Sequence, residues 1–282
     1  LQGGVTYYLP TSLNTVEVTN ARVVYTNAFQ NMTKLENCII DYVDSNQRLQ
    51  REIFHNNPKL ADLTLPFIGY ADNSYGSENW WWWYTGRTHD SISWIFSTKK
   101  GSADDYWYSP YYDDVYDKDN PSSPRWDERY IPASLKKVTI TNESVIEGYA
   151  MHGLTKVEEI IISDKTTRIS QGAFRYCNSL KSITLPFVGT YRNELGTSKY
   201  ENTFISIFSK GYSQNSDVVS NIYGSSYIPS SLRTITISNK NTKIPTAAFM
   251  NLSNVETITF ESGNKSFQLP DIDVMSALDR AP

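Results

Sequence analysis

Residues 131–189, IPASLKKVTITNESVIEGYAMHGLTKVEEIIISDKTTRISQGAFRYCNSLKSITLPFVG, decide the fold of this 282-residue chain. In this stretch a small residue and a large apolar one are followed six positions later by the start of an apolar run. Ala150-Met151 precedes Val157 in this way, and Ala173-Phe174 precedes Leu180. The same offset recurs outside the stretch, after Ala28-Phe29, Ile53-Phe54 and Ala248-Phe249. Copies at one fixed offset indicate a sequence repeat.

Each apolar run has the form L-x-x-V-x-I, with apolar and mostly polar residues alternating over its last four positions. This alternation predicts a short strand with one buried face. Such a strand is too short to build a core alone. The eight runs begin at Leu13, Leu35, Leu60, Leu135, Val157, Leu180, Leu232 and Val255.

Neighbouring runs start 22 to 25 residues apart, except for gaps of 75 residues after Leu60 and 52 residues after Leu180. A period in the low twenties is typical of a solenoid, in which each unit buries its apolar face by stacking on its neighbours. We therefore expect one parallel strand per run. The two long gaps predict coils with inserted loops, at about 69–129 and 189–226.

The other half of each coil is represented by Ile169 to Phe174. Ser170 is placed to cap a short helical turn, while Ile169 and Phe174 point inward. We expect strands on one face of the stack and helical or irregular turns on the other.

The pattern IxxxAFxxCxxLxxIxLP, at Ile169 to Pro186, resembles the BspA-like leucine-rich repeat of bacterial and some protozoal surface proteins. The order LPF(I/V)G, IFS and YIP(A/S)SL resembles a longer variant of that repeat. The resemblance implies a right-handed leucine-rich-repeat solenoid, formed as a single domain over 1–282, with eight short parallel strands. It does not indicate a ligand, because such families share the scaffold and differ in what they bind. The two copies of the longer order lie at Leu65–Gly69, Ile95–Ser97 and Tyr130–Leu135, and at Leu185–Gly189, Ile207–Ser209 and Tyr227–Leu232.

Composition narrows the class of partner. The chain has 26 basic and 30 acidic residues and no long basic run, which argues against nucleic acid. No apolar stretch approaches the roughly 18 residues needed to cross a membrane. Because the chain begins at Leu1, we expect an extracellular fragment whose signal peptide and anchor are absent. Cys38 and Cys177 are expected to be buried and unpaired.

The end of the chain, 261–282, carries apolar residues that are suited to cover the open end of a stack. We expect a partial cap there. The alternative is that the sequence stops inside a longer array of repeats. The apolar residues are Phe267, Leu269, Ile272, Val274, Met275 and Leu278.

All seven tryptophans lie between positions 80 and 126. Four of them, Trp80 to Trp83, are contiguous, and no regular structure points four successive side chains the same way. At least one or two of them face solvent, a neighbouring loop or a ligand. One interpretation is a platform that stacks on sugars or anchors a protein. The alternative is a small core within the insert, with Trp94 and Phe96 as its first members. The platform would comprise Trp80, Trp81, Trp82, Trp83, Tyr84, Trp107, Tyr108, Tyr111 and Tyr112.

Other candidate sites are weaker. Asp113 to Asn120 supplies oxygen ligands but lacks the spacing of a calcium hand, so a solvated acidic loop is favoured over a calcium site. The histidines, His55, His89 and His152, have no metal-binding spacing and are expected in surface or turn packing. Catalytic and nucleotide-binding motifs are missing, so we expect no enzyme activity and no cofactor. Three carboxylates are expected on the exposed side of strands or turns: Glu143, Glu158 and Glu159.

Threonine occupies one outward position in five of the eight runs. Threonine suits an exposed pleated surface, so a structural role is favoured over an ice-binding ladder. The ladder is interrupted by Glu17, Ile39 and Ile161. Its members are Thr64, Thr139, Thr184, Thr236 and Thr259.

These observations favour a non-catalytic adhesion or protein-interaction module of a bacterial cell-surface or secreted protein. The alternative is a carbohydrate-binding module that acts through the tryptophan-rich insert. The expected partner is therefore an extracellular protein or a glycan. The sequence fixes neither the ligand nor the oligomeric state.

Overall fold

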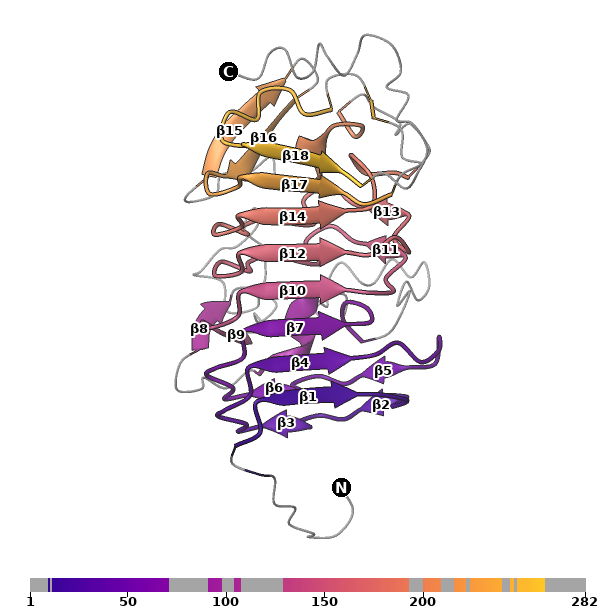
Figure 1. Cartoon of the computed structure of the whole chain (residues 1–282), viewed down its shortest axis with the longest axis vertical. Helices are drawn as coiled ribbons and strands as arrows, with labels where there is room; N and C mark the ends of the chain where they lie inside the picture. The colour runs from indigo at the N-terminus through magenta and orange to yellow at the C-terminus, as the bar shows by residue number, and fades with distance from the viewer. Residues whose placement is uncertain are drawn as a thin grey trace, which may run out of the picture.

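The computed structural model of the chain describes residues 10, 12–70, 91–97, 104–107, 129–192, 200–208, 216–221, 224–239, 244–245 and 248–261. An eight-stranded parallel sheet follows the long axis of the molecule (Figure 1). Its strands stack in chain order, as a solenoid requires. They are β1 (Thr15–Val18), β4 (Asn37–Ile40), β7 (Asp62–Leu65), β10 (Lys137–Ile140), β12 (Glu159–Ile162), β14 (Ser182–Leu185), β17 (Thr234–Ile237) and β18 (Thr257–Phe260).

Each of the eight predicted runs forms one of these strands. Across the gap of 75 residues, Leu63 in β7 pairs with Val138 in β10. Across the gap of 52 residues, Ile183 in β14 pairs with Ile235 in β17. The repeat position of every strand is thus kept through both long coils, and the prediction of a parallel stack is confirmed.

The inward residues of the strands form the core. From β4 to β17, the second and fourth residues of each strand are at most 1% exposed. Burial of each such side chain contributes about 1.5 to 3 kcal/mol. At the two ends the corresponding residues are only half-buried, because each end strand has one neighbour. These half-buried residues are Val16, Val18, Ile258 and Phe260.

One turn type begins all eight strands. The N–H of the first residue of each run donates to the carbonyl three residues earlier, as Leu135 does to Pro132 at 3.0 Å. The sequence YLPTSL at 8–13 is a third copy of YIP(A/S)SL, and Leu13 donates to Pro10 in the same way. The carbonyl of Ala61 then accepts from both Lys136 and Lys137, a pattern repeated at the other strands of the stack.

The opposite face, the back face, is made of very short parallel pairs and turns. In the part of the chain that the structure describes, the helical segments are two 3-10 turns, η3 (Ile92–Ile95) and η5 (Phe204–Ile207). Apart from these two 3-10 turns, the described back face is irregular, so of the two expected forms the irregular turn predominates. The pairs are β2 (Val23–Val24) with β5 (Arg48–Leu49), β3 (Phe29–Gln30) with β6 (Phe54–His55), and β11 (Val145–Ile146) with β13 (Arg168–Ile169).

Left-handed residues explain why these turns do not become helices. Asn27 and Asn31, which flank Ala28-Phe29, have φ of 60° and 60°. Positive φ interrupts an α-helix and is tolerated best by glycine and asparagine. Ile169 and Phe174 point inward as predicted, both 0% exposed. Ser170 does not cap a helix, because its hydroxyl donates to the Glu147 carboxylate at 2.9 Å.

A buried polar contact links successive coils at the repeat position of Cys177. The Cys177 thiol donates to the carbonyl of Met151 at 3.2 Å. Asn57, three coils earlier in the repeat pattern, donates from Nδ2 to the carbonyl of Phe29 at 2.7 Å. Both cysteines are buried and unpaired, as predicted. Burial raises the pKa of the Cys38 and Cys177 thiols to about 12.

Both long coils return to the stack midway. Phe96 bridges to Phe54, and the N–H of Phe174 donates to the carbonyl of Ile207, so η3 and η5 take the place of back-face turns. An antiparallel hairpin then leads into the next main strand in each case (Figure 1). Each predicted insert is thus interrupted by a segment that belongs to the solenoid core. The hairpins are β8 (Asp104–Trp107) with β9 (Arg129–Pro132), and β15 (Ser216–Asn221) with β16 (Gly224–Pro229).

Candidate binding surface

The outward side of the main sheet, here called the outer sheet face, is formed by the first and third residues of the eight strands. The predicted threonine row lies on it, with Thr64 beside Thr139 in the ladder. Thr184 and Thr236 are likewise neighbours. Half-buried and exposed side chains in register give this face a regular, flat relief.

Charge divides the outer sheet face along the stack. The first residues of β7, β10 and β12 are Asp62, Lys137 and Glu159, with Lys137 Nζ 3.4 Å from the Glu159 carboxylate. The first residues of the last three strands carry hydroxyls instead. They are Ser182, Thr234 and Thr257. The face therefore has a charged centre and an uncharged polar C-terminal part.

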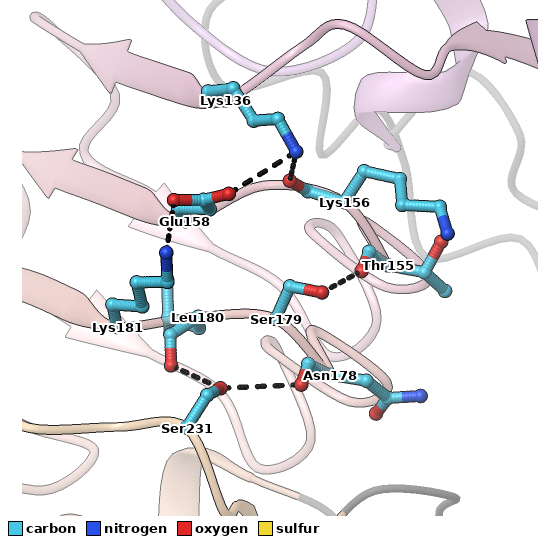
Figure 2. Close-up of polar contacts among 9 residues, drawn as sticks. All are labelled: Lys136, Thr155, Lys156, Glu158, Asn178, Ser179, Leu180, Lys181 and Ser231. Atoms are coloured by element: carbon cyan, nitrogen blue, oxygen red, sulfur yellow. Dashed lines mark hydrogen bonds and ion pairs between the residues drawn. The ribbon is translucent and has the colours of Figure 1, made fainter.

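Ion pairs continue at the edge where the strands begin, here called the amino edge (Figure 2). The Glu158 carboxylate lies 3.2 Å from Lys136 Nζ and 2.6 Å from Lys181 Nζ. Hydrogen bonds from Lys181 and then Lys136 lower the pKa of Glu158. These charges largely neutralise one another and are exposed, so the pairs contribute little to stability.

Serine hydroxyls tie the same edge together (Figure 2). Ser179 Oγ donates to the carbonyl of Thr155 at 2.6 Å, and Ser231 Oγ donates to the carbonyl of Leu180 at 2.8 Å. Each bond joins one coil to the preceding one. The amino edge is therefore held rigid in addition to the sheet ladder.

A small cavity lies beneath the β15–β16 hairpin, away from the outer sheet face. It is lined by Val219, Ile228 and Leu252 among others and has a volume of about 10 Å³, room for about one water molecule. The outer sheet face itself is flat, rigid and of mixed polarity, which suits contact with a macromolecule.

The predicted aromatic platform falls almost wholly outside the described residues. This applies to Trp80, Trp81, Trp82, Trp83, Tyr84, Tyr108, Tyr111 and Tyr112. Trp107 ends β8, where its backbone pairs with Arg129, and its side chain lies outside the described part. The platform stays a prediction.

Trp94 and Phe96 are packed inward, as the alternative interpretation expects, but on the solenoid core and not in a separate core of the insert. Phe96 is 0% exposed, and Trp94 is half-buried. The guanidinium of Arg129, a residue only 2% exposed, lies 5.9 Å from the Trp94 ring centre and donates to the carbonyl of Phe96 at 3.0 Å. These two aromatic residues therefore serve the core of the long coil.

One residue holds both flanks of segment 71–90. The Leu49 N–H donates to the carbonyl of Tyr70 at 2.9 Å, and Trp94 Nε1 donates to the carbonyl of Leu49 at 3.0 Å. The Tyr70 and Trp94 rings meet edge to face at 6.3 Å. The flanks of the segment that contains Trp80 to Tyr84 thus lie together on the back face.

Trp107 is attached elsewhere. It ends β8, whose partner strand β9 joins the amino edge through Pro132 and Leu135. Trp107 and the flanks of segment 71–90 therefore lie at two different places on the solenoid, a point that the sequence alone does not reveal.

A buried polar cluster on the back face was missed by sequence reasoning. Arg175 is 7% exposed, and its guanidinium lies 4.6 Å from the Tyr176 ring centre and 5.7 Å from that of Tyr149. His152 is 2% exposed and meets Tyr176 edge to face at 4.9 Å. Burial, and then the Arg175 charge, lower the pKa of His152 well below its usual value. His152 thus packs in a turn, as expected.

Glu143 was expected on the exposed side of a strand or turn, and this prediction is wrong. It is 4% exposed rather than on an exposed side, and its carboxylate accepts the N–H of Ile68 at 2.9 Å. It thereby fixes the chain reversal after β7. Glu158 and Glu159 are partly exposed and pair with lysines.

Metal-binding chemistry has little support in the described ranges, where no three His, Cys, Asp or Glu side chains cluster as a metal site needs. The possible calcium loop, Asp113 to Asn120, and His89 lie outside these ranges. No described helix has the length and apolar character that crossing a membrane takes.

The repeats match the sequence profile of the BspA type leucine-rich repeat region in six copies, over residues 5–72 and 132–221. This is more than half of the chain. The chain belongs to the BspA-type leucine-rich repeat family. The resemblance seen at Ile169 to Pro186 is thereby confirmed, and this BspA-type chain forms its repeats as a parallel β-solenoid almost without helix in its described part.

Among solved structures, the BspA-type chain is similar to a leucine-rich cell surface protein of Faecalibacterium prausnitzii, at 15% identity and a TM-score of 0.26. The similarity covers 89% of this chain and 61% of that one, so the chain spans less than two thirds of that protein's length. None of the curated proteins compared with the chain matches it significantly.

Proposed function

We propose that the chain is a non-catalytic extracellular binding module that recognises a protein on another surface or in the surrounding matrix. The observation that carries this proposal is the outer sheet face. Eight strands in strict register present a flat polar surface whose side chains are not needed for the core. Such a face gains affinity from area and complementarity rather than from a pocket.

Membership in a leucine-rich repeat family supports a binding role. The Faecalibacterium protein is described as a leucine rich cell surface protein. We infer the same location for this chain. Its specific partner is left to experiment.

Binding should be tested on a panel of immobilised extracellular matrix proteins, with wild type and two outer-face variants, Thr139→Arg and Thr184→Arg. The bulky cations should weaken binding at least about tenfold, equivalent to about 1.4 kcal/mol. Thr33→Arg, at an exposed turn, is the matched control and should bind like wild type. Equal binding by wild type and all variants would contradict the proposal that the outer sheet face is the binding site.

A second candidate function is carbohydrate binding through the tryptophan-rich insert. It is favoured by Tyr70, which is 39% exposed and contacts Trp94 beside the flanks of segment 71–90. Exposed aromatic rings stack on sugar faces. Deletion of 72–89 separates the two candidates, because it removes Trp80 to Trp83 and keeps the core segment Ile92–Ile95, so outer-face binding to protein should survive it. A glycan hit that Trp81→Ala and Trp82→Ala abolish would support the carbohydrate role, and a glycan panel without hits would count against it.

A further inference from the structure

Both strands of the hairpin β15–β16 contact the solenoid, and β16 also leads directly into the main sheet. Gly224 in β16 lies so close to the Tyr200 ring that a Cβ there would come within 2.5 Å of Cδ2. The Tyr200 hydroxyl is hydrogen-bonded to Ser226 Oγ, and Ser226 is 0% exposed. β16 then runs directly into the turn before β17. It is therefore fixed to the solenoid, and β15 is the second strand of the two-stranded hairpin (Figure 1).

Among the described residues, β15 has a partner strand on one side only. β15 pairs with β16 alone over six residue pairs, from Ser216–Pro229 to Asn221–Gly224. In an antiparallel pair every second residue directs its N–H and C=O away from its partner. The ladder in the described part of the chain adds no strand on that side of β15. These backbone groups are available to a further strand.

This edge lacks the features that usually prevent strand addition. The sequence SDVVSN contains no proline and no lysine, which are the common protections of edge strands. Its one charged residue, Asp217, already accepts a hydrogen bond from Asn254 Nδ2. Val218 is 57% exposed and is one of three large exposed apolar residues among those described. In the other hairpin, β8 places Asp104 and Asp105 on the corresponding edge strand.

We propose that β15 is a self-association edge, at which two copies of this chain pair their β15 strands antiparallel about a twofold axis. The register centred on Val218 brings the two Val218 residues together and places each Asp217 opposite Val219. No like charges meet in this register, and like charges directly opposite one another would destabilise the pair. Twofold pairing also closes the assembly at two copies. The result is one four-stranded sheet, β16–β15–β15–β16. This inference goes beyond the proposed function and does not depend on it.

The test is analytical ultracentrifugation of the full chain over a roughly hundredfold range of concentration. Wild type should show a reversible monomer–dimer equilibrium. Val218→Lys and Val218→Glu should each raise the dimer dissociation constant at least about tenfold, because each places like charges at the twofold axis. An equimolar mixture of the two variants should recover dimers, because the opposite charges then face each other.

Tyr25→Lys, at an exposed apolar residue on the N-terminal coil, is the matched control and should dimerise like wild type. The mixing step also guards against misfolding, since unfolded variants would not recover. A wild type that stays monomeric throughout would overturn the proposal. So would a dimer that survives both substitutions, one that the mixture fails to recover, or one lost in Tyr25→Lys.

Discussion

The back-face turns of the N-terminal coils and of the central coils use the same repeat positions with different side chains. In the N-terminal coils three left-handed positions are filled by Asn27, Asn31 and Asn56, and a fourth is filled by Glu52. In the central coils two of them are filled by Tyr149 and Tyr176, with φ of 67° and 60°. Asparagine accepts this conformation readily, and a large aromatic residue does so only at a cost of about 1 to 2 kcal/mol.

The central coils offset this cost by packing. Each tyrosine ring contacts the Arg175 guanidinium, and the rings also enclose His152. A cation over an aromatic face contributes about 0.5 to 2 kcal/mol, of the same order as the strain. The two regions show that the repeat requires a left-handed backbone at these positions. Different side chains can stabilise that backbone.

The largest effect is expected from the N-terminal turn. Phe54→Ala removes a ring that lies 5.4 Å from Phe29 and 5.9 Å from Phe96, centre to centre. The cavity should cost about 3 to 5 kcal/mol in the free energy of unfolding. In a stack, the damage should open the terminal coils first. Hydrogen exchange should therefore speed up in β2 to β6 more than in β11 to β14, and uniform acceleration would contradict this.

The next effect concerns the contact between coils at Asn57. Asn57→Ala leaves the Phe29 carbonyl without the side-chain donor and should cost about 1 to 3 kcal/mol. Asn57→Cys should cost less, because Cys177 makes the equivalent contact with Met151 through its thiol. Urea unfolding of both variants measures the difference. If the two variants are equally destabilised, the two contacts are not interchangeable.

Acid should weaken the central turn through His152. Its pKa is lowered in the folded state, so below about pH 6.5 the unfolded chain binds a proton that the folded chain does not. This group therefore destabilises the fold as pH falls below about 6.5, by at most about 1.4 kcal/mol per unit. Thermal melts from pH 7 to pH 5 should show a steeper loss in wild type than in His152→Gln. Parallel profiles would contradict the prediction.

The smallest effect is expected from substitutions at the left-handed backbone positions. Asn56→Ala should destabilise by about 1 kcal/mol, because alanine tolerates positive φ less well than asparagine and because the exposed bond from Asn56 Nδ2 to Asn31 Oδ1 is lost. Tyr149→Asn should change stability by less than about 1 kcal/mol, because relieved strain compensates for the lost contact with Arg175. Chemical unfolding of the two variants checks both values. A large loss in Tyr149→Asn would mean that packing outweighs strain.

Much of the main sheet could be predicted from the sequence. Alternation from Leu13 to Phe260 indicates strands of period two, and the offsets of 22 to 25 residues place equivalent residues side by side. The long gaps do not disturb this, because the register at Leu63–Val138 depends on the repeat position and not on the loop between.

The back face and the polar interior could not be predicted in the same way. Ala173-Phe174 after Ser170 is compatible with a helical turn, and only the left-handed positions around it exclude that. The burial of Glu143, His152 and Arg175 depends on neighbours in adjacent coils. The spacing of residues along the sequence does not show which side chains meet across coils. The recurrence of IFS in the second long coil predicts that Trp94 and Phe96 are packed, which is correct, but it does not predict that they pack on the solenoid core instead of within the insert.

Tyr70 and Trp94 both hydrogen-bond to the backbone of Leu49, so the two flanks of segment 71–90 are held at one point. A loop whose flanks are fixed at one point can lengthen or shorten without moving the strands on either side. Doubling a flexible loop costs only about 0.6 kcal/mol in closure entropy. The long coil can therefore act as a graft site, where new recognition sequences are tried while the scaffold keeps its register.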